Sequence, residues 1–257
     1  MLDWLSKDPR GFLLFMLYRA PAVLMAITLH EYAHGYVAAK CGDPTARIKG
    51  RLSLNPVKHM DPLGTICLFL FGFGWAKPVP VNPNNFRNPK RDDILVSLAG
   101  VTVNFMVFLI STLLAVFIGR HLYEIPFDSA NVYRFFLDAR SEGFTIQLFP
   151  QYVDVLMPLL KTPWLIHLQR VVLHSILINI GLCLFNLLPL PPLDGFHVVN
   201  QLVFKGKIYM GGKPFRIMQG ALMALMLFTD VVSDFVGKAI YFVQGNVLDI
   251  MLRLVGI

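Results

Sequence analysis

Four long apolar stretches restrict what this chain can fold into. They cover approximately residues 20–40, 94–118, 166–190 and 217–236, and each approaches or exceeds the roughly 20 residues that a helix needs to cross a bilayer core. Charged residues make up only 15% of the 257 residues, against roughly 25% in an average soluble protein. These features exclude a disordered chain, a disulfide scaffold and an ordinary soluble enzyme. They predict a mainly α-helical, polytopic membrane protein whose residues 1–257 form a single domain.

The first stretch is expected to be broken near its start. A single helix over residues 11–40 would be about 45 Å long, which exceeds the thickness of the hydrocarbon core. Arg19 and Pro21 offer a natural break. We therefore expect an interfacial helix up to about Arg19 and a span that begins near Ala20.

The charges between the stretches predict the orientation of the chain. The net charge is +7, and most of the basic surplus falls in two connections. Residues 195–216 carry four basic residues and no acidic one, whereas residues 119–165 carry four basic residues against five acidic ones. Nine basic residues lie in the connection between the first two spans: Lys40, Arg47, Lys49, Arg51, Lys58, Lys77, Arg87, Lys90 and Arg91. By the positive-inside rule, the two basic connections are cytoplasmic and the third is outside.

Residues 46–82 are not typical of ordinary spanning helices. In Arg47–Leu54 every second residue tends to be apolar, which is typical of a β-strand. Residues 62–75 are apolar, but as a helix they would extend only about 21 Å. We therefore expect a small membrane-associated β-hairpin or sheet and a re-entrant loop. Non-helical backbone at membrane depth is tolerated only where it is buried in protein or lines a wet cavity, so this region indicates a nearby site.

The first span contains the sequence HEYAH, which matches the pattern HExxH at His30, Glu31 and His34. Residues four apart share one face of a helix, so both imidazoles can bind one metal ion with Glu31 beside it. Zinc is the usual ion for such ligands in a hydrolytic site, with three protein ligands and a water molecule. Glu31 would accept the proton of that water as general base. The pattern also arises by chance in soluble helices, but a Glu and two His inside a span are costly and indicate function.

A third metal ligand is expected at the end of the third stretch. Asp194 follows three prolines that break the helix, and the predicted topology places it at the same cytoplasmic depth as His34. Asp194 could instead cap a helix beside a turn glycine. His197 could also be the ligand in its place. The three cysteines are widely spaced and form no CxxC pair, so they predict neither a disulfide framework nor a cysteine metal site.

Three motifs occur in order, each within a predicted span. They are HEYAH (residues 30–34), SLAGVTVN (residues 97–104) and NLLPLPPLDG (residues 186–195). Together they resemble the site-2 protease family of intramembrane zinc metalloproteases, peptidase family M50. The resemblance covers about residues 20–200, which is most of the chain.

This resemblance implies a metal site and a location. It implies one Zn²⁺ per chain held by His30, His34 and Asp194, with Glu31 as the catalytic base. It also implies a multi-pass protein of the prokaryotic plasma membrane whose active site lies towards the cytoplasm. Residues 48–54 and 72–82 look like the family's membrane-associated sheet and loop. No stretch is long and polar enough for the PDZ or CBS module of many relatives, so we expect a compact member.

Two asparagines are candidates for binding substrate. Gly100 and Asn104 match the family's Gly-x-x-x-Asn pattern, and Asn186 matches the asparagine that precedes its Leu-Asp-Gly motif. Amide donors suit the binding of substrate backbone or the polarisation of a scissile carbonyl. For Asn104, an interhelical hydrogen bond is the alternative. Gly100 is expected to permit close helix packing.

The expected function is hydrolysis of peptide bonds within or near transmembrane segments of other membrane proteins, as in regulated intramembrane proteolysis. The edge of the strand in residues 47–54 could hold an unwound substrate by strand addition, or this segment could be a purely structural hairpin. One alternative function is a metal-binding membrane transporter, which also uses intramembrane histidines and carboxylates. Transporters usually show paired repeats, and the sequence contains none.

A second alternative is a proteolytically inactive scaffold that binds membrane proteins, against which the intact HExxH pattern argues. The expected partners are therefore transmembrane protein substrates and the lipid bilayer. No nucleic acid is expected, because the chain has no basic soluble domain. The sequence does not specify an oligomeric state. It also leaves open whether the last apolar stretch, residues 239–257, crosses the membrane or lies on it.

Overall fold

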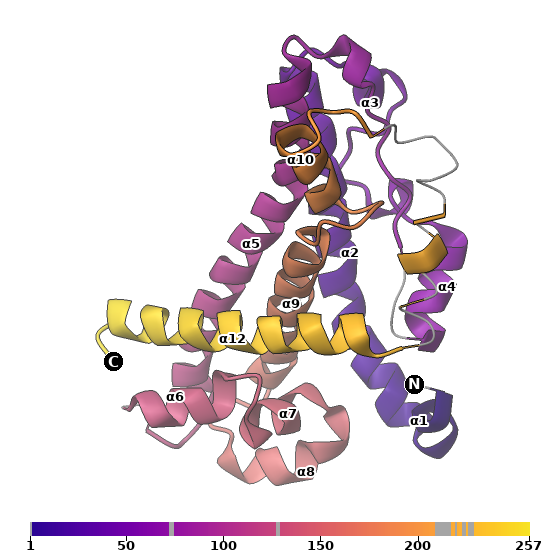
Figure 1. Ribbon diagram of the computed structural model, residues 1–257. Coiled ribbons are helices and arrows are strands. Elements are labelled where there is room, and N and C mark those ends of the chain that lie inside the picture. Colours follow the sequence, from indigo (N-terminus) through magenta and orange to yellow (C-terminus); the bar gives the residue numbers. More distant parts are fainter. Residues whose placement is uncertain are drawn as a thin grey trace.

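A computed structural model describes residues 2–71, 75–126, 129–208, 217–218, 220–222, 225 and 229–257. Three long helices form its centre, α2 (Pro9–Lys40), α5 (Pro89–Leu122) and α9 (Leu165–Asn186), and they pack against one another (Figure 1). Together with α12 (Val231–Leu254), they are the four helices of the described residues that are long and apolar enough to cross a membrane. The mainly α-helical character of the chain is thus confirmed.

The predicted break in the first helix is wrong. α2 begins after Asp8, whose carboxylate accepts a hydrogen bond from the backbone N–H of Gly11 at 2.9 Å, and it continues through Pro21 to Lys40. A proline removes a single backbone donor, and in α2 that loss does not interrupt the helix. At 1.5 Å per residue, the helix is about 48 Å long, so it extends beyond the hydrocarbon core unless it is strongly tilted.

The β-strand predicted for Arg47–Leu54 is not there. A short helix, α3 (Thr45–Ile48), takes its first part, and Gly50 follows it with a positive φ of 63°. Ile48 and Leu54 are 77% and 61% exposed, so the alternating apolar residues do not mark a face buried against the core. In the described part of the chain, β-pairing is limited to two isolated bridges, Met60 with Ala76 and Tyr123 with Leu160. The expected hairpin is therefore not supported.

The short apolar segment after α3 forms a helix that is too short to cross a membrane. This helix, α4 (Pro62–Phe71), is capped by Asp61, whose carboxylate accepts from the N–H of Gly64 at 2.8 Å. It lies beside α2 in Figure 1. The expected re-entrant region also included residues 72–74, which lie outside the described residues.

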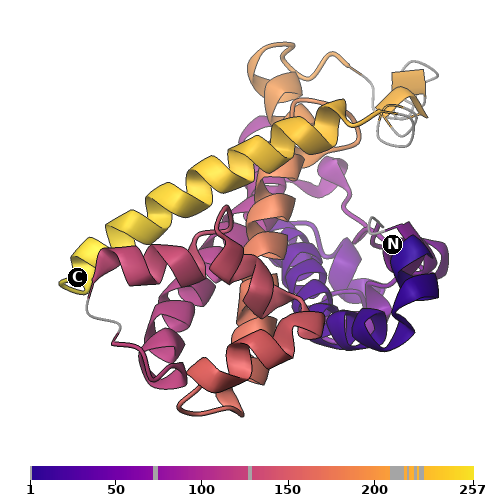
Figure 2. The same ribbon diagram turned by 90° about the horizontal axis from the view of Figure 1, so that it is seen from below.

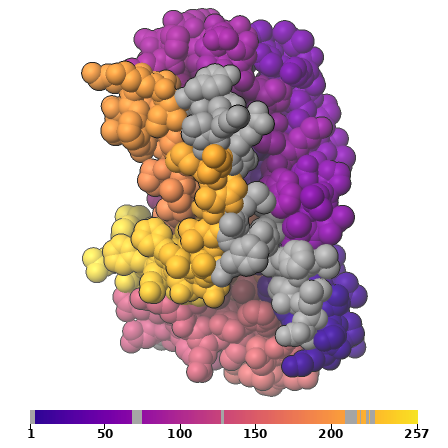
Figure 3. Space-filling view, turned by 45° about the vertical axis from the view of Figure 1, so that its right-hand side comes forward, coloured from indigo at the N-terminus to yellow at the C-terminus, as the bar shows by residue number. Residues whose placement is uncertain are grey.

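The last two predicted spans differ from the structure in their ends. α9 ends at Asn186, four residues before the predicted end, and much of the predicted span 217–236 lies outside the described residues. The fourth long apolar helix is instead α12, which overlaps the stretch whose placement the sequence left open. Figures 1 and 2 show α12 running crosswise to α5 and α9. In Figure 3 it lies on one face of the molecule, between the orange segment of α10 (Asp194–Leu202) and the pink segment of α6 (Ala130–Leu137), α7 (Glu142–Leu148) and α8 (Val153–Leu156).

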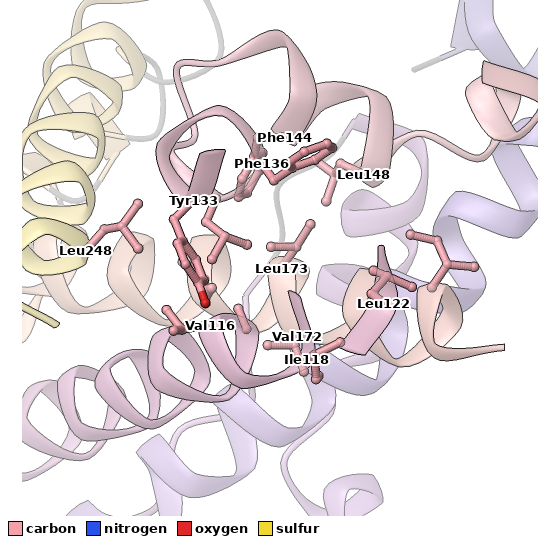
Figure 4. Packing of buried hydrophobic residues seen from close by; sticks show 14 of the residues in the cluster. Val116, Ile118, Leu122, Tyr133, Phe136, Phe144, Leu148, Val172, Leu173 and Leu248 are labelled. Carbon is pink, nitrogen blue, oxygen red and sulfur yellow. The ribbon is translucent and has the colours of Figure 1, made fainter. Parts of the chain in front are cut away.

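A layer of short helices, which consists of α6, α7 and α8, covers the end of the bundle opposite to α10 (Figures 1 and 2). Tyr133 and Phe136 from this layer pack with Phe144, Leu173 of α9 and Leu248 of α12 in the main apolar core (Figure 4). Because this core joins α5, α9 and α12 to the layer, it holds the long helices in register. The other helices that have defined bounds in the described part of the chain are α1 (Leu2–Lys7), η1 (Pro56–Lys58), η2 (Pro83–Asn85), η3 (Pro150–Tyr152) and η4 (Met157–Leu159).

Candidate metal centre

The structure brings together His30, His34 and Asp194. Their potential ligand atoms all lie within 4.8 Å of one another. The Nε2 atoms of the two histidines are 3.0 Å apart, and Oδ2 of Asp194 lies 3.3 Å from His30 Nε2 and 3.4 Å from His34 Nε2. Two helices that are far apart in the sequence, α2 and α10, therefore supply one compact cluster.

The polypeptide between α9 and α10 brings Asp194 to this cluster. Asp194 is the first residue of α10, and the preceding residue, Leu193, is the N-cap, so the alternative of Asp194 as the cap residue does not apply. A Cβ atom on Gly195 would lie 2.3 Å from the carbonyl oxygen of Leu187. Only glycine allows the chain to fold back this closely on the end of α9.

His197 does not join the cluster. Its Nδ1 atom lies 3.7 Å from Oδ1 of Asp93 on α5. The other carboxylate oxygen of Asp93 accepts a hydrogen bond from the Gln201 side chain at 2.7 Å. These contacts attach α10 to α5, so the alternative of His197 as the third ligand has no support in the geometry.

The hydrogen bonds of Asn104 determine which ring nitrogen of His30 carries the proton. The Asn104 Nδ2 atom lies 3.2 Å from the carbonyl oxygen of Ala26 and 2.8 Å from Oδ1 of Asn179. Both neighbours are oxygens, and the Asn179 amide is itself oriented by donation to the carbonyl of Ser175 at 2.9 Å. The oxygen of Asn104 therefore faces His30 Nδ1 at 2.6 Å, and His30 Nδ1 must donate.

The second histidine has the same protonation pattern. Nδ1 of His34 lies 2.8 Å from the backbone carbonyl oxygen of Val96, which can only accept. Both histidines thus carry the proton on Nδ1 and direct the lone pair of Nε2 into the cluster. The short distance between the two Nε2 atoms is consequently not a hydrogen bond.

Three lone-pair atoms that face one another repel unless a cation lies among them. Oδ2 of Asp194 is buried and has no hydrogen-bond partner among the described residues. Two imidazole nitrogens and one carboxylate oxygen form a donor set that is typical of catalytic zinc, which keeps its fourth position for water. The residues present therefore fit a zinc ion.

The glycine of the second motif lies directly against the two imidazoles. A Cβ atom on Gly100 would be 2.6 Å from Cε1 of His30 and 2.6 Å from Nε2 of His34. The expected close packing of helices is present, and its reason is specific. The backbone of α5 approaches the histidine rings at a distance that no side chain allows.

Glu31 lies between the two histidines in the sequence and contacts a different segment. Its Oε2 atom accepts a hydrogen bond from the backbone N–H of Val79 at 2.7 Å. Val79 belongs to the proline-rich segment that follows the bridge between Met60 and Ala76. This donor fixes one carboxylate oxygen beside the metal cluster.

The two asparagines predicted to bind substrate have different surroundings. Asn104 is fully buried and makes the interhelical hydrogen bond that was the alternative interpretation. Asn186 is half-buried at the end of α9, where its Nδ2 donates to the carbonyl of Leu182 at 3.0 Å. Substrate binding by either residue stays a prediction.

Sequence reasoning missed two buried polar residues, one at the site and one in the connection that follows α2. Asn179 orients Asn104, and an asparagine inside an apolar span was the signal that could have revealed it.

Asp43 is buried directly after α2, and its carboxylate accepts several hydrogen bonds. The backbone N–H of Asn82 and Nδ2 of Asn85 each donate to it at 2.7 Å. The backbone N–H of Thr45 donates at 3.1 Å, and the Thr45 hydroxyl also donates. Burial by itself would raise the pKa of Asp43, but these donors together hold it below its usual value.

Comparisons with known proteins agree with this chemistry. Peptidase family M50 matches residues 18–228. The protein named "Putative zinc metalloprotease YwhC" of Bacillus subtilis is 38% identical over 191 residues, which are 74% of this chain and 71% of YwhC. No solved structure matches significantly.

Two proteins named Rip2, with the same description, are similar over shorter regions. Rip2 of Mycolicibacterium smegmatis is 27% identical over 114 residues, 41% of this chain and 44% of that protein. Rip2 of Mycobacterium tuberculosis H37Rv is 34% identical over 85 residues, 32% of this chain and 33% of that protein. The family match covers most of the chain, including both halves of the metal cluster. The chain therefore belongs to peptidase family M50, and it is a multi-pass membrane zinc metallopeptidase.

Proposed function

We propose that this peptidase cleaves other membrane proteins within or near their transmembrane segments, with His30, His34 and Asp194 as zinc ligands and Glu31 as general base. The observation that carries the proposal is the convergence of three lone-pair atoms on one point beside a long apolar helix. His30 and His34 are both part of α2, and a peptide bond that reaches them must lie at membrane depth.

The residues of the cluster have distinct tasks. Zinc, when bound, acts as a Lewis acid that makes water acidic enough to attack a peptide carbonyl near neutral pH. Asn104 and the Val96 carbonyl keep the protons of the two histidines on Nδ1, so that both Nε2 lone pairs are available. Glu31 accepts the proton of the attacking water and delivers it to the leaving amine. The Val79 N–H holds one oxygen of Glu31 in place for this transfer.

The orientation of the site follows from the loop charges. His34 is six residues from Lys40 at the end of α2, about 9 Å along the helix. Nine basic residues lie at this end of the helices, from Lys40 to Arg91, so the positive-inside rule assigns this end to the cytoplasm of a cell membrane. The proposed substrate is therefore a transmembrane protein cut towards its cytoplasmic end, and Asn186 is proposed to contact its unwound backbone.

A cleavage assay with a matched pair of variants tests the proposal. The wild-type protein, Glu31→Gln and the surface variant Glu142→Gln would be reconstituted in liposomes with a single-span model substrate, and the zinc content of each would be measured. We expect Glu31→Gln to keep its zinc and lose about 10²- to 10⁴-fold in rate. Glu142→Gln is expected to cleave like the wild type. Cleavage by zinc-loaded Glu31→Gln at the wild-type rate would contradict the proposed role of Glu31 as general base.

A further inference from the structure

A second polar cluster lies between α2 and α9, away from the metal centre. Arg170 and His174 are one turn apart on α9, and Arg19 lies opposite them on α2. The Phe15 ring contacts two of these groups, with the Arg19 guanidinium carbon 5.9 Å from its centroid and the His174 ring 4.7 Å away, edge-on. Both guanidinium groups are within electrostatic reach of His174. Two positive charges thus share one location between two spanning helices.

The hydrogen-bonding capacity of this cluster is not met by the protein. Arg170 is only 2% exposed, and its Nε donates to the carbonyl of Gln147 at 2.8 Å. Its Nη2 is buried without a partner in the described residues, as are Nε of Arg19 and Nε2 of His174. Three side-chain nitrogen atoms from two helices are therefore buried near one another without a hydrogen-bond partner among the described residues.

The charge of the cluster is also uncompensated. Among the described residues, neither Arg19 nor Arg170 forms an ion pair, although carboxylates pair with arginine elsewhere, as Asp249 does with Arg134 at 2.8 Å. The face of the Tyr18 ring, 5.4 Å from the Arg170 guanidinium, supplies only a weak attraction. Burying a guanidinium without an anion is costly. This cost is removed when an anion with several acceptor oxygens binds, and phosphate matches the guanidinium fork best.

The depth of the cluster indicates where such an anion comes from. Trp164 is 66% exposed directly before α9, and exposed tryptophan is typical of the membrane–water interface. Arg170 follows six residues later, about 9 Å further along the helix axis. On α2, Leu17 precedes Arg19 by two residues, on a different face of the helix, and is 65% exposed, as expected for a helix in contact with lipid at this depth. Arg170 is thus within about two helical turns of the headgroup level, a distance over which a long arginine side chain can extend towards the headgroups.

We propose that Arg19, Arg170 and His174 form a phosphate-binding site that takes the headgroup phosphate of an anionic phospholipid. The site is separate from the metal centre, because Arg19 is 11 residues before His30 on the same helix, about 16 Å along its axis. A bound lipid phosphate satisfies the unpaired donors and links α2 to α9 at a distance from the metal cluster. The proposal does not depend on the peptidase activity.

Native mass spectrometry of the full-length protein tests this site. The protein would be released from detergent micelles that contain phosphatidylglycerol or diacylglycerol with identical acyl chains, so that only the headgroup differs. We expect one phosphatidylglycerol to remain bound and no diacylglycerol. Arg170→Gln and Arg19→Gln should each lower the affinity for phosphatidylglycerol at least tenfold. Arg253→Gln, which removes an exposed cation from α12, should leave it unchanged.

Three outcomes would overturn the proposal. Equal retention of phosphatidylglycerol and diacylglycerol would show that the phosphate is not recognised. Unchanged affinity in both cluster variants would exclude these arginines. Binding of inorganic phosphate without binding of the lipid would exclude the lipid as its source. The zinc content of each variant shows independently whether the variant is folded. Arg19 is less buried than Arg170, so Arg19→Gln alone tests the site if Arg170→Gln does not fold.

Discussion

The side-chain oxygen of Asn104 on α5 lies 2.6 Å from Nδ1 of His30 on α2. This hydrogen bond joins residues 74 positions apart in the sequence, and it sets the protonation of a proposed zinc ligand. Hydrogen-bond partners of this kind commonly raise metal affinity 10- to 100-fold. The strength of the metal site therefore depends on the packing of α5 against α2.

Removing the acceptor at Asn104 is expected to weaken zinc binding. Asn104→Leu should lower zinc affinity about 10- to 100-fold, because His30 can then carry its proton on either nitrogen. Asn104→Asp keeps an acceptor at the same place and should retain more of the affinity. Competition with a chelator of known affinity measures the effect. Asn246→Leu, at an exposed position of α12, is the control, and equal affinities of all variants would contradict the prediction.

Asn179 should act only through Asn104. Asn179→Leu removes the acceptor 2.8 Å from Asn104 Nδ2 but leaves the Ala26 carbonyl, so the loss of zinc affinity should be smaller than in Asn104→Leu. The double variant should bind zinc no more weakly than Asn104→Leu alone, because residues in one network are not additive. Additive losses in the same chelator competition would show that Asn179 acts independently.

A methyl group at Gly100 should disrupt the metal centre. In Gly100→Ala the new Cβ would lie 2.6 Å from ring atoms of both histidines, so the rings or α5 must move. We expect zinc content and cleavage to fall at least tenfold while the helical circular dichroism is retained. Gly237→Ala in α12 is the matched control, because nothing lies within 4 Å of its Cβ. That change should keep zinc and stabilise the protein by up to about 1 kcal/mol.

The buried carboxylate of Asp43 should make stability dependent on acid pH. Its pKa is lowered in the folded protein, against about 3.9 in an unfolded chain. Its contribution is therefore fully present above the unfolded pKa and is lost as the pH falls through the folded value. Asp43→Asn should destabilise the protein by about 1–3 kcal/mol at neutral pH and flatten this acid dependence.

Thermal unfolding in detergent between pH 3 and pH 7 measures the effect of Asp43→Asn. The difference in melting temperature from the wild type should be largest at neutral pH and should shrink towards low pH. Asp154→Asn, at an exposed position of α8, is the control. It should change neither the melting temperature nor its dependence on pH. A difference that is independent of pH would contradict the assigned role of the charge.

The sequence by itself predicted the elements that depend on local pattern. The lengths of the apolar stretches indicated α5 and α9, because a run of some twenty apolar residues has few alternatives to a spanning helix. The spacing of His30 and His34 predicted their shared face, because four residues are about one helical turn. Local pattern failed at Arg47–Leu54, where a glycine with positive φ and a short helix replaced the expected strand.

Only the tertiary structure decided how these elements form a site. The meeting of Asp194 with the histidines, the contact of Gly100 with their rings and the orientation of Asn104 by Asn179 all join separate helices. The crosswise path of α12 likewise follows from its packing on α9 and on the short-helix layer, and not from its composition (Figure 1). Periodicity reports which face of a helix is apolar, but the neighbour of that face is set by packing between distant segments. For this reason the sequence named the metal ligands, whereas the groups that fix their protons and distances emerged only from the fold.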